Sequence, residues 1–366
     1  MVLVLLQHAF LACDLSTLPG DIALVVWYST YLAAIGFVSI AGAMCGYRMR
    51  PGMTFPEIYK RVVMKSVLVL VGAHFAINAS DYWFTRQVLD ANGEPRSTFE
   101  ILVLGFPITD TIGVCLLIYP LVAVSLSHRM QVCMAILMHA FPQFWLGLAD
   151  PLFTSVAVEA MIGRIGEPRW FWWPLLPWLA VFILGGVVGS KLPGYLGDAE
   201  SLRRLSRDAI RWGLVLFLAS MLSVSCYWAL RHVVDFPNTS VELRALYPRQ
   251  TTGLMPGYLA VLCWMFAALQ WRESYGERRG AWEWWLSVFG RTSLFVFVVQ
   301  FFVVESIPAM FGWTGHLDWL QATTLFVLSA ATMWSIGFGY GRIRGTIRDK
   351  DREDFTMSRA VEPERG

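Results

Sequence analysis

Stretches of about 20 apolar residues recur along the whole chain, and no other feature constrains its fold as strongly. A bilayer core about 30 Å thick needs about 20 mostly apolar residues in each helix that crosses it. Of the 366 residues, 56% are hydrophobic and only 15% are charged, and the mean hydropathy is +0.52. A soluble domain rarely has this composition. The sequence therefore predicts an all-α, polytopic integral membrane protein.

Ten apolar ranges predict about ten transmembrane helices within a bundle over residues 1–342. The first range is short, because thirteen helical residues extend only about 20 Å. We expect this helix either to lack its cytoplasmic half or only to enter the bilayer. The charged segment 343–366 has no apolar period and predicts a disordered cytoplasmic tail. The ten ranges are 1–13, 22–47, 59–80, 101–126, 130–149, 171–190, 209–229, 253–271, 284–311 and 317–341.

The distribution of Lys and Arg predicts the orientation, because cationic loops stay in the cytoplasm. With the N-terminus inside, the cytoplasmic segments carry 22 of the 29 Lys and Arg residues, and the outer loops carry 7. This asymmetry predicts that both termini lie in the cytoplasm. The net charge of +2 argues against nucleic acid as a partner. The cysteines show no metal-ligand spacing, so we expect neither a metal site nor a disulfide framework.

Two outer connections are long enough to form a structure of their own. Residues 150–170 contain an apolar stretch too short to cross a membrane, which suggests an interfacial or re-entrant helix. Residues 230–252 are rich in hydrogen-bonding groups, which would suit the lining of a site for a polar acceptor.

Five ionisable residues lie well inside the predicted spans, where such groups are costly and tend to face a cavity or a partner, while Lys65 and Arg291 lie closer to the cytoplasmic ends. For His8, His74 and His139 the alternative to a functional role is structural hydrogen bonding. Glu305 has the alternative of reaching the outer interface. Asp110 follows Gly105 and Pro107 in "LGFPITDTIGVCLLIYP", so a helix break precedes a carboxylate at membrane depth. Helix capping is the alternative for Asp110.

Several segments resemble, in order, acyltransferase family 3 and the related heparan-α-glucosaminide N-acetyltransferase-like proteins. "VLVLLQHAF" is similar to the first-helix end of these families, where an apolar run leads to a functional histidine. The other similar segments are "YLAAIGFVSIAGAMCGYRM" at 31–49, "WWPLLPWLAVFILGGVVG" at 172–189, "LYPRQ" at 246–250 and "FGRTSLFVFVVQFF" at 289–302. Together they cover nearly the whole chain.

The chain departs from the family pattern at two places. The Asp-x-x-Arg-Gly element that usually precedes the histidine is absent, and residues lost upstream of Met1 would be one explanation for its absence. A chain that truly began at Met1 would lack the arginine that these families use in handling the acyl donor. Gln300 stands where many relatives have a second histidine.

The resemblance implies transfer of an acyl group from a cytoplasmic donor, such as acyl-CoA, to a hydroxyl or amine of an extracytoplasmic acceptor. The expected acceptor is a carbohydrate, the expected location is the bacterial inner membrane, and acyl-CoA serves as co-substrate with no bound cofactor. His8 is the expected general base or acyl carrier, with Asp110 in the same cavity as a second catalytic residue. The expected substrate-binding residues are Gln7, Tyr247, Arg249, Gln300 and Glu305, and the expected donor-binding residues are Arg48 and Arg291.

Two other classes of function stay open from the sequence. In a secondary transporter or lipid flippase, Asp110, Glu305 and the histidines would relay protons or bind substrate. The absence of visible internal repeats argues against this class. The third class is a non-catalytic membrane scaffold with the same fold. Only an acyltransferase should bind acyl-CoA on its basic face and turn it over.

Overall fold

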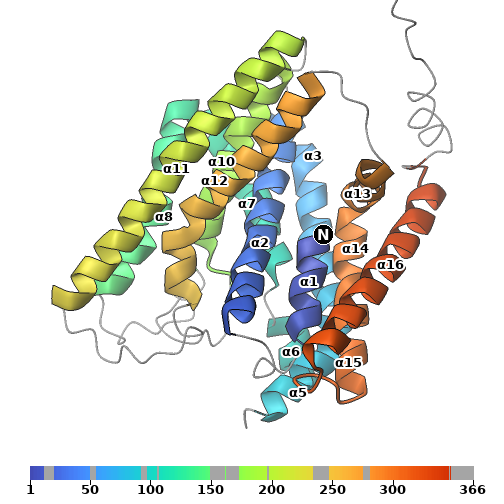
Figure 1. Cartoon of the computed structure of the whole chain (residues 1–366). Helices are drawn as coiled ribbons and strands as arrows, with labels where there is room; N and C mark the ends of the chain where they lie inside the picture. The colour runs from blue at the N-terminus through green and yellow to red at the C-terminus, as the bar shows by residue number, and fades with distance from the viewer. Residues whose placement is uncertain are drawn as a thin grey trace, which may run out of the picture. The chain divides into compact units, whose positions relative to one another are not determined.

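The computed structural model describes residues 1–11, 20–49, 55–91, 97–104, 107–148, 161, 173–195, 198–233, 247–274, 281–345 and 347. These residues form helices and no strand (Figure 1). Each of the ten apolar ranges contains a helix. The predicted interfacial helix and polar outer connection fall mostly outside the described residues, as does the predicted tail beyond residue 347.

Five of the described helical segments are long and apolar enough to cross a membrane, which confirms the all-helical class and is compatible with an integral membrane protein. The count of ten crossings, the single bundle and the inward N-terminus stay predictions. The five segments are Phe55–Ser80, Ile108–Ser125, Leu175–Gly194, Ser293–Met310 and Trp319–Ile343.

The chain divides into two compact units. Unit 1 comprises Met1–Ala33, Phe75–Val103 and Gly276–Gly366, and unit 2 comprises Ala34–His74 and Leu104–Tyr275. Helix α2 (Gly20–Arg48) runs from the first unit into the second. Helix α4 (His74–Ser80) likewise begins at the last residue of a unit 2 segment and continues in unit 1.

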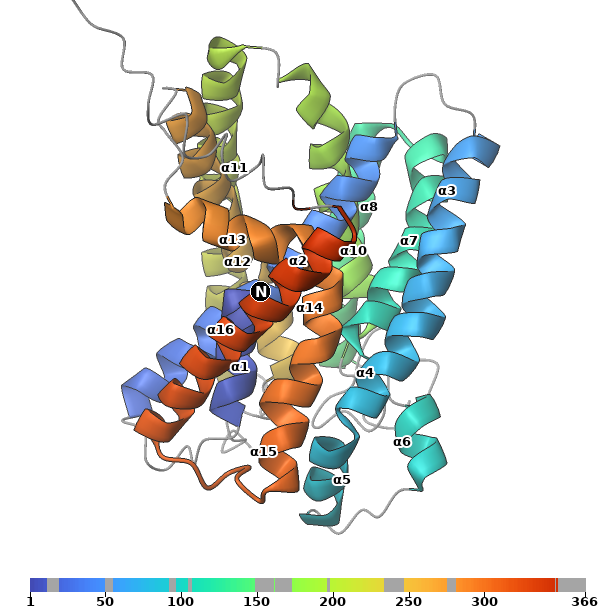
Figure 2. The same ribbon diagram turned by 90° about the vertical axis from the view of Figure 1, so that its right-hand side faces the viewer.

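Unit 1 is built around the short helix α1 (Val2–Leu11), which packs against α16 (Trp319–Ile343) and the π-helical segment η4 (Phe301–Ser306) (Figures 1 and 2). Its apolar core joins residues of α1, α13, α14, η4 and α16, namely Leu5, Ala9, Phe289, Val296, Val304, Ala330 and Met333. The other helices of the unit are α5 (Tyr82–Ala91), α6 (Thr98–Leu104), α13 (Ala281–Arg291), α14 (Ser293–Gln300) and α15 (Ile307–Met310).

The start of α16 is fixed by a reciprocal cap. The Asp318 carboxylate accepts from the backbone N–H of Gln321 at 2.8 Å, and the Gln321 side chain accepts from the backbone N–H of Asp318 at 2.9 Å. A capping box of this kind satisfies two backbone donors that a helix start otherwise leaves unpaired. It therefore fixes where the helix that covers α1 begins.

In unit 2, α3 packs along α7, α10 contacts both α7 and α8, and α11 packs along α12 (Figure 2). A π-helical segment, η2, continues α3 and ends directly before His74. The helices of this unit are α3 (Phe55–Val67), η2 (Leu68–Ala73), α7 (Ile108–Ser125), α8 (His128–Leu148), α10 (Leu175–Lys191), the short η3 (Leu192–Gly194), α11 (Ala199–Val233) and α12 (Tyr247–Ser274).

Helices α2 and α10 approach each other closely through glycines. A Cβ atom at Gly46 would lie 2.0 Å from the carbonyl oxygen of Gly186, and one at Gly189 would lie 1.9 Å from the carbonyl oxygen of Ala43. Any larger side chain at these positions would force the backbones apart. Small residues at such contacts are typical of helix pairs in membranes, where association depends on close van der Waals packing.

Candidate functional site

The side chains of His8 on α1 and Glu305 on η4 are in direct contact in unit 1. The Nδ1 atom of His8 pairs with Oε1 of Glu305. The two side chains are only 15% and 3% exposed. His8 therefore does not face lipid, and the Glu305 side chain is directed into the protein, while its depth relative to the outer interface stays a prediction.

The π-helical segment η4 positions Glu305 within the helical run Ser293–Met310. π-helical turns are rare, and they occur frequently at functional sites. The ring of Phe301, in the same segment, meets the His8 imidazole edge-on, with 4.9 Å between the ring centroids. Leu5 and Ala9 on either side of His8 are fully buried in the core of the unit. The imidazole is thus held by apolar packing as well as by the carboxylate.

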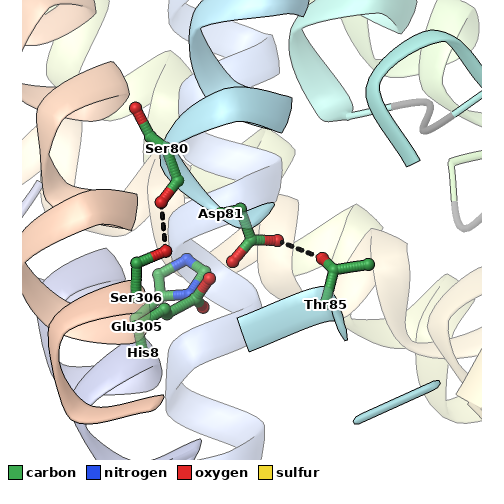
Figure 3. Close-up of polar contacts among 6 residues, drawn as sticks. All are labelled: His8, Ser80, Asp81, Thr85, Glu305 and Ser306. Carbon is green, nitrogen blue, oxygen red and sulfur yellow. Dashed lines mark hydrogen bonds and ion pairs between the residues drawn. The ribbon is translucent and has the colours of Figure 1, made fainter. Parts of the chain in front are cut away.

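Asp81 adds a second carboxyl group beside the pair (Figure 3). The hydroxyl of Thr85 donates to Oδ2 of Asp81 at 2.9 Å. Oδ1 of Asp81 has no hydrogen-bond partner among the described residues, and the charge of Glu305 acts on this carboxyl group. Burial and then the charge of Glu305 raise the pKa of Asp81, which follows the Phe55–Ser80 span, well above its usual range. This direction favours the protonated form of Asp81, which can donate a hydrogen bond to Glu305.

A serine contact fixes the position of Asp81 relative to η4. The hydroxyl of Ser306, the residue after Glu305, donates to the backbone carbonyl of Ser80, the residue before Asp81 (Figure 3). Ser306 is fully buried. This bond joins the end of α4 to η4 at the point where the two carboxyl groups meet.

The arrangement leaves one histidine nitrogen for proton transfer. Nδ1 pairs with the Glu305 carboxylate, so the neutral imidazole carries its N–H proton on Nδ1. In this tautomer Nε2 has the free lone pair. No described residue hydrogen-bonds Nε2. A carboxylate behind the imidazole also stabilises the positive charge that forms when Nε2 takes a proton, and the buried surroundings strengthen this effect. The cluster has the chemistry of a general base.

Gln300 ends α14 and directly precedes η4. Its side chain is fully buried, and neither Nε2 nor Oε1 has a hydrogen-bond partner among the described residues. A buried amide with both polar atoms unpaired is rare in native proteins. Gln300 thus directly precedes the segment that carries Glu305.

Unit 2 contains a separate histidine–carboxylate pair. His74 Nδ1 and Asp110 Oδ2 lie 2.6 Å apart, and Asp110 is buried. The predicted helix break is confirmed, since α6 ends at Leu104 and α7 begins at Ile108 after Pro107. Asp110 does not cap α7, however, because Pro107 is the N-cap residue, so the capping alternative is wrong. That Asp110 shares a cavity with His8 stays a prediction, because the two residues belong to different units.

The structure does not bring all the other predicted site residues together. Gln7 is partly buried on α1, next to His8. Tyr247 and Arg249 lie in the first turn of α12, where side chains fall outside the described part of the chain. The two predicted donor-binding residues end different helices and are exposed: Arg48 ends α2 in unit 2, and Arg291 ends α13 in unit 1.

Sequence reasoning missed Asp81 as a site residue. The predicted span 59–80 ends one residue before it, so Asp81 was outside the set of ionisable groups in apolar ranges. A usable signal was the helix end at "NASD", because a carboxylate directly after an apolar helix can face a partner at the membrane boundary. In the described part of the chain, no three His, Cys, Asp or Glu residues are grouped to hold a metal ion.

Comparisons of the chain with protein-family models, with curated proteins and with solved structures find no match.

Proposed function

We propose that the protein is a membrane acyltransferase that moves an acyl group from cytoplasmic acyl-CoA to a hydroxyl or amine of an extracytoplasmic carbohydrate. The observation that carries the proposal is the buried contact between His8 and Glu305, with Asp81 beside it. A histidine oriented by a carboxylate, with its other nitrogen unpaired, is suited to take a proton from an acceptor. The proposed setting is the bacterial inner membrane.

In the proposed reaction, Nε2 of His8 removes the proton from the acceptor hydroxyl or amine. The acceptor oxygen or nitrogen then forms a bond to the thioester carbonyl carbon. The bond between that carbon and the CoA sulfur breaks, and the leaving thiolate takes the proton from His8. Glu305 keeps its charge throughout and stabilises the imidazolium, while Asp81 keeps its proton and holds Glu305 in place.

The proposed sidedness follows from the charges of the chain. Segments with 22 of the 29 Lys and Arg residues are expected on the cytoplasmic side, where they favour an anionic donor such as CoA. Arg48 and Arg291 are the proposed donor-binding residues. Gln7, Tyr247 and Arg249 are proposed to contact the acceptor or the acyl group.

The experiment that tests this function uses the purified full chain in liposomes. Acetyl-CoA or succinyl-CoA is added on one side, and glucosamine or a gluco-oligosaccharide is enclosed on the other. Release of CoA thiol that depends on the enclosed acceptor, with acylated sugar found by mass spectrometry, is the expected result. Absence of both products with every donor and acceptor pair would contradict the proposal.

Proton-coupled transport is the second candidate, because both units contain a buried histidine–carboxylate pair. Buried ionisable pairs of this kind occur in proton relays of transporters. In the same liposomes, a transporter would move protons with a solute and would leave acetyl-CoA intact. A pH-sensitive dye inside the vesicles distinguishes the two candidates in one preparation.

A further inference from the structure

We infer that the side-chain amide of Gln300 is the binding group for the acyl carbonyl. Nε2 donates to the carbonyl oxygen of the acyl group, and Oε1 accepts from an O–H or N–H of the acceptor other than the one whose proton His8 removes. This inference rests on the proposed acyl transfer and assigns one part of that site. Gln300 is then a catalytic residue, since the negative charge that develops on the carbonyl oxygen falls on its N–H donor.

The first argument is the unmet bonding capacity of the amide. Gln300 is fully buried, and among the described residues its two polar side-chain atoms have no hydrogen-bond partner. Leaving such a group unpaired destabilises the folded protein. A fully buried donor and acceptor with no hydrogen-bond partner among the described residues are matched by a ligand that supplies an acceptor and a donor.

The second argument is the position of Gln300 on its helix. It lies four residues after Val296 and four before Val304, and both of these valines pack in the core that contains Leu5 and Ala9 of α1. Within α14, residues spaced by four lie on one side of the helix, so Gln300 lies on the side of Val296. Leu5 and Ala9 flank His8 in the sequence. Gln300 thus lies on the side of α14 whose Val296 packs with the helix that carries the base.

The third argument is the register between Gln300 and Glu305. A π-helical turn joins residues five positions apart, and Glu305 is the fifth residue after Gln300. The two side chains therefore lie about one turn apart along the same side of η4. Phe301, the residue after Gln300, contacts the His8 ring. An acyl carbonyl bound by the Gln300 amide would lie beside His8, the base that removes the proton of the attacking acceptor.

Binding of the acyl carbonyl by Gln300 leaves the proton transfers of the proposed reaction unchanged. The amide of Gln300 gains and loses no proton, because it only donates one hydrogen bond and accepts another. The acceptor's proton goes to His8 and then to the CoA thiolate. Gln300 is fully buried, and a buried setting strengthens a hydrogen bond to developing charge.

The test replaces Gln300 by methionine, which keeps the length of the side chain and removes both polar atoms. Gln131→Met is the matched control, because Gln131 is also a buried glutamine, but its Nε2 donates to the carbonyl of Leu126 at 2.9 Å. Thermal unfolding is measured on the full chain without ligand. Gln300→Met should raise Tm by about 2 °C or more, whereas Gln131→Met should lower it.

Binding of acetyl-CoA and of CoA to the same purified proteins is measured by calorimetry. The parent protein and Gln131→Met should bind acetyl-CoA about 3- to 10-fold more tightly than CoA, since one hydrogen bond to the acyl group separates the two ligands. Gln300→Met should bind both ligands equally, with the affinity for CoA unchanged.

Each outcome of the two measurements decides a different point. A lower Tm for Gln300→Met would mean that the amide has a structural partner, and a retained preference for acetyl-CoA would mean that it does not bind the acyl group. Either result overturns the inference and leaves the proposed acyl transfer standing. A parent protein that binds neither ligand would overturn the proposed function, and the inference with it.

Discussion

His8 and Glu305 lie 297 positions apart in the sequence, and the imidazole Nδ1 of one contacts the carboxylate Oε1 of the other. Such a pair is costly to bury in a membrane protein, because each group loses its hydration. Glu305 lies on a π-helical turn, and Asp81 is a third ionisable residue beside the pair. Both features indicate that the contact between His8 and Glu305 has a role other than packing.

Glu305→Gln should reduce acyl transfer by about 10²- to 10⁴-fold, because glutamine fits the space but removes the charge that orients and stabilises the imidazolium. The affinity for acetyl-CoA should stay within about 3-fold of the parent value, since donor binding does not need this charge. Steady-state kinetics of CoA release give both quantities. Glu200→Gln is the control, because Glu200 is 76% exposed in a surface ion pair of little energetic value. Full activity of Glu305→Gln would show that the carboxylate has no role in the reaction.

Asp81→Asn should keep acyl transfer within about 3-fold of the parent rate, because an amide can donate a hydrogen bond to Glu305 as the protonated carboxyl does. Asp81→Ala removes this donor and should reduce the rate by about 10-fold or more, since Glu305 then loses its support. The ratio of the two rates, measured on equal amounts of folded protein, is the readout. An asparagine variant as inactive as the alanine variant would mean that Asp81 acts as an anion.

The sequence predicted the helices well, because the bilayer requires long apolar segments that are visible in the order of residues. The break before α7 was also predictable, since Gly105 and Pro107 interrupt an apolar range. The partners of the buried ionisable groups could not be predicted. His8 and Glu305 come from opposite ends of the chain, and no local pattern encodes their contact. The π-helical turn that positions Glu305 has no sequence signature in "FFVVES".

The His74–Asp110 pair should behave as one thermodynamic unit. Asp110→Leu or His74→Leu alone leaves one buried polar group without its partner and should reduce stability by about 3 to 5 kcal/mol. The double variant should recover part of this loss, because both groups are then absent. Thermal unfolding of the four proteins gives the coupling. Additive losses would contradict a direct pairing.

The activity of Asp110→Asn decides whether this pair also serves the acyl transfer. Lost transfer with unchanged folding would support a shared cavity with His8. Full retention would limit Asp110 to the structure of unit 2.

The orientation of the chain predicts the side on which three segments lie. Reporter fusions after Lys191 and after Arg272 should report the cytoplasm, and a fusion within residues 232–250 should report the outside, because cationic loops are retained inside. Alkaline phosphatase and fluorescent-protein reporters give opposite signals at each position. The reversed pattern would contradict the predicted orientation. The segments proposed to bind the acyl donor would then face away from the cytoplasm.

The most direct test of the account compares His8→Gln with the parent protein. Glutamine retains hydrogen bonding to Glu305 but cannot accept a proton at Nε2, so loss of activity reports the base itself. Labelled acetyl-CoA is supplied to the full chain in liposomes with enclosed acceptor, and acylated product and bound CoA are measured together. The account predicts that product formation falls by about 10²- to 10⁴-fold while CoA binding is nearly unchanged. Product formation by His8→Gln at the parent rate would contradict it, because His8 would then have a structural role only.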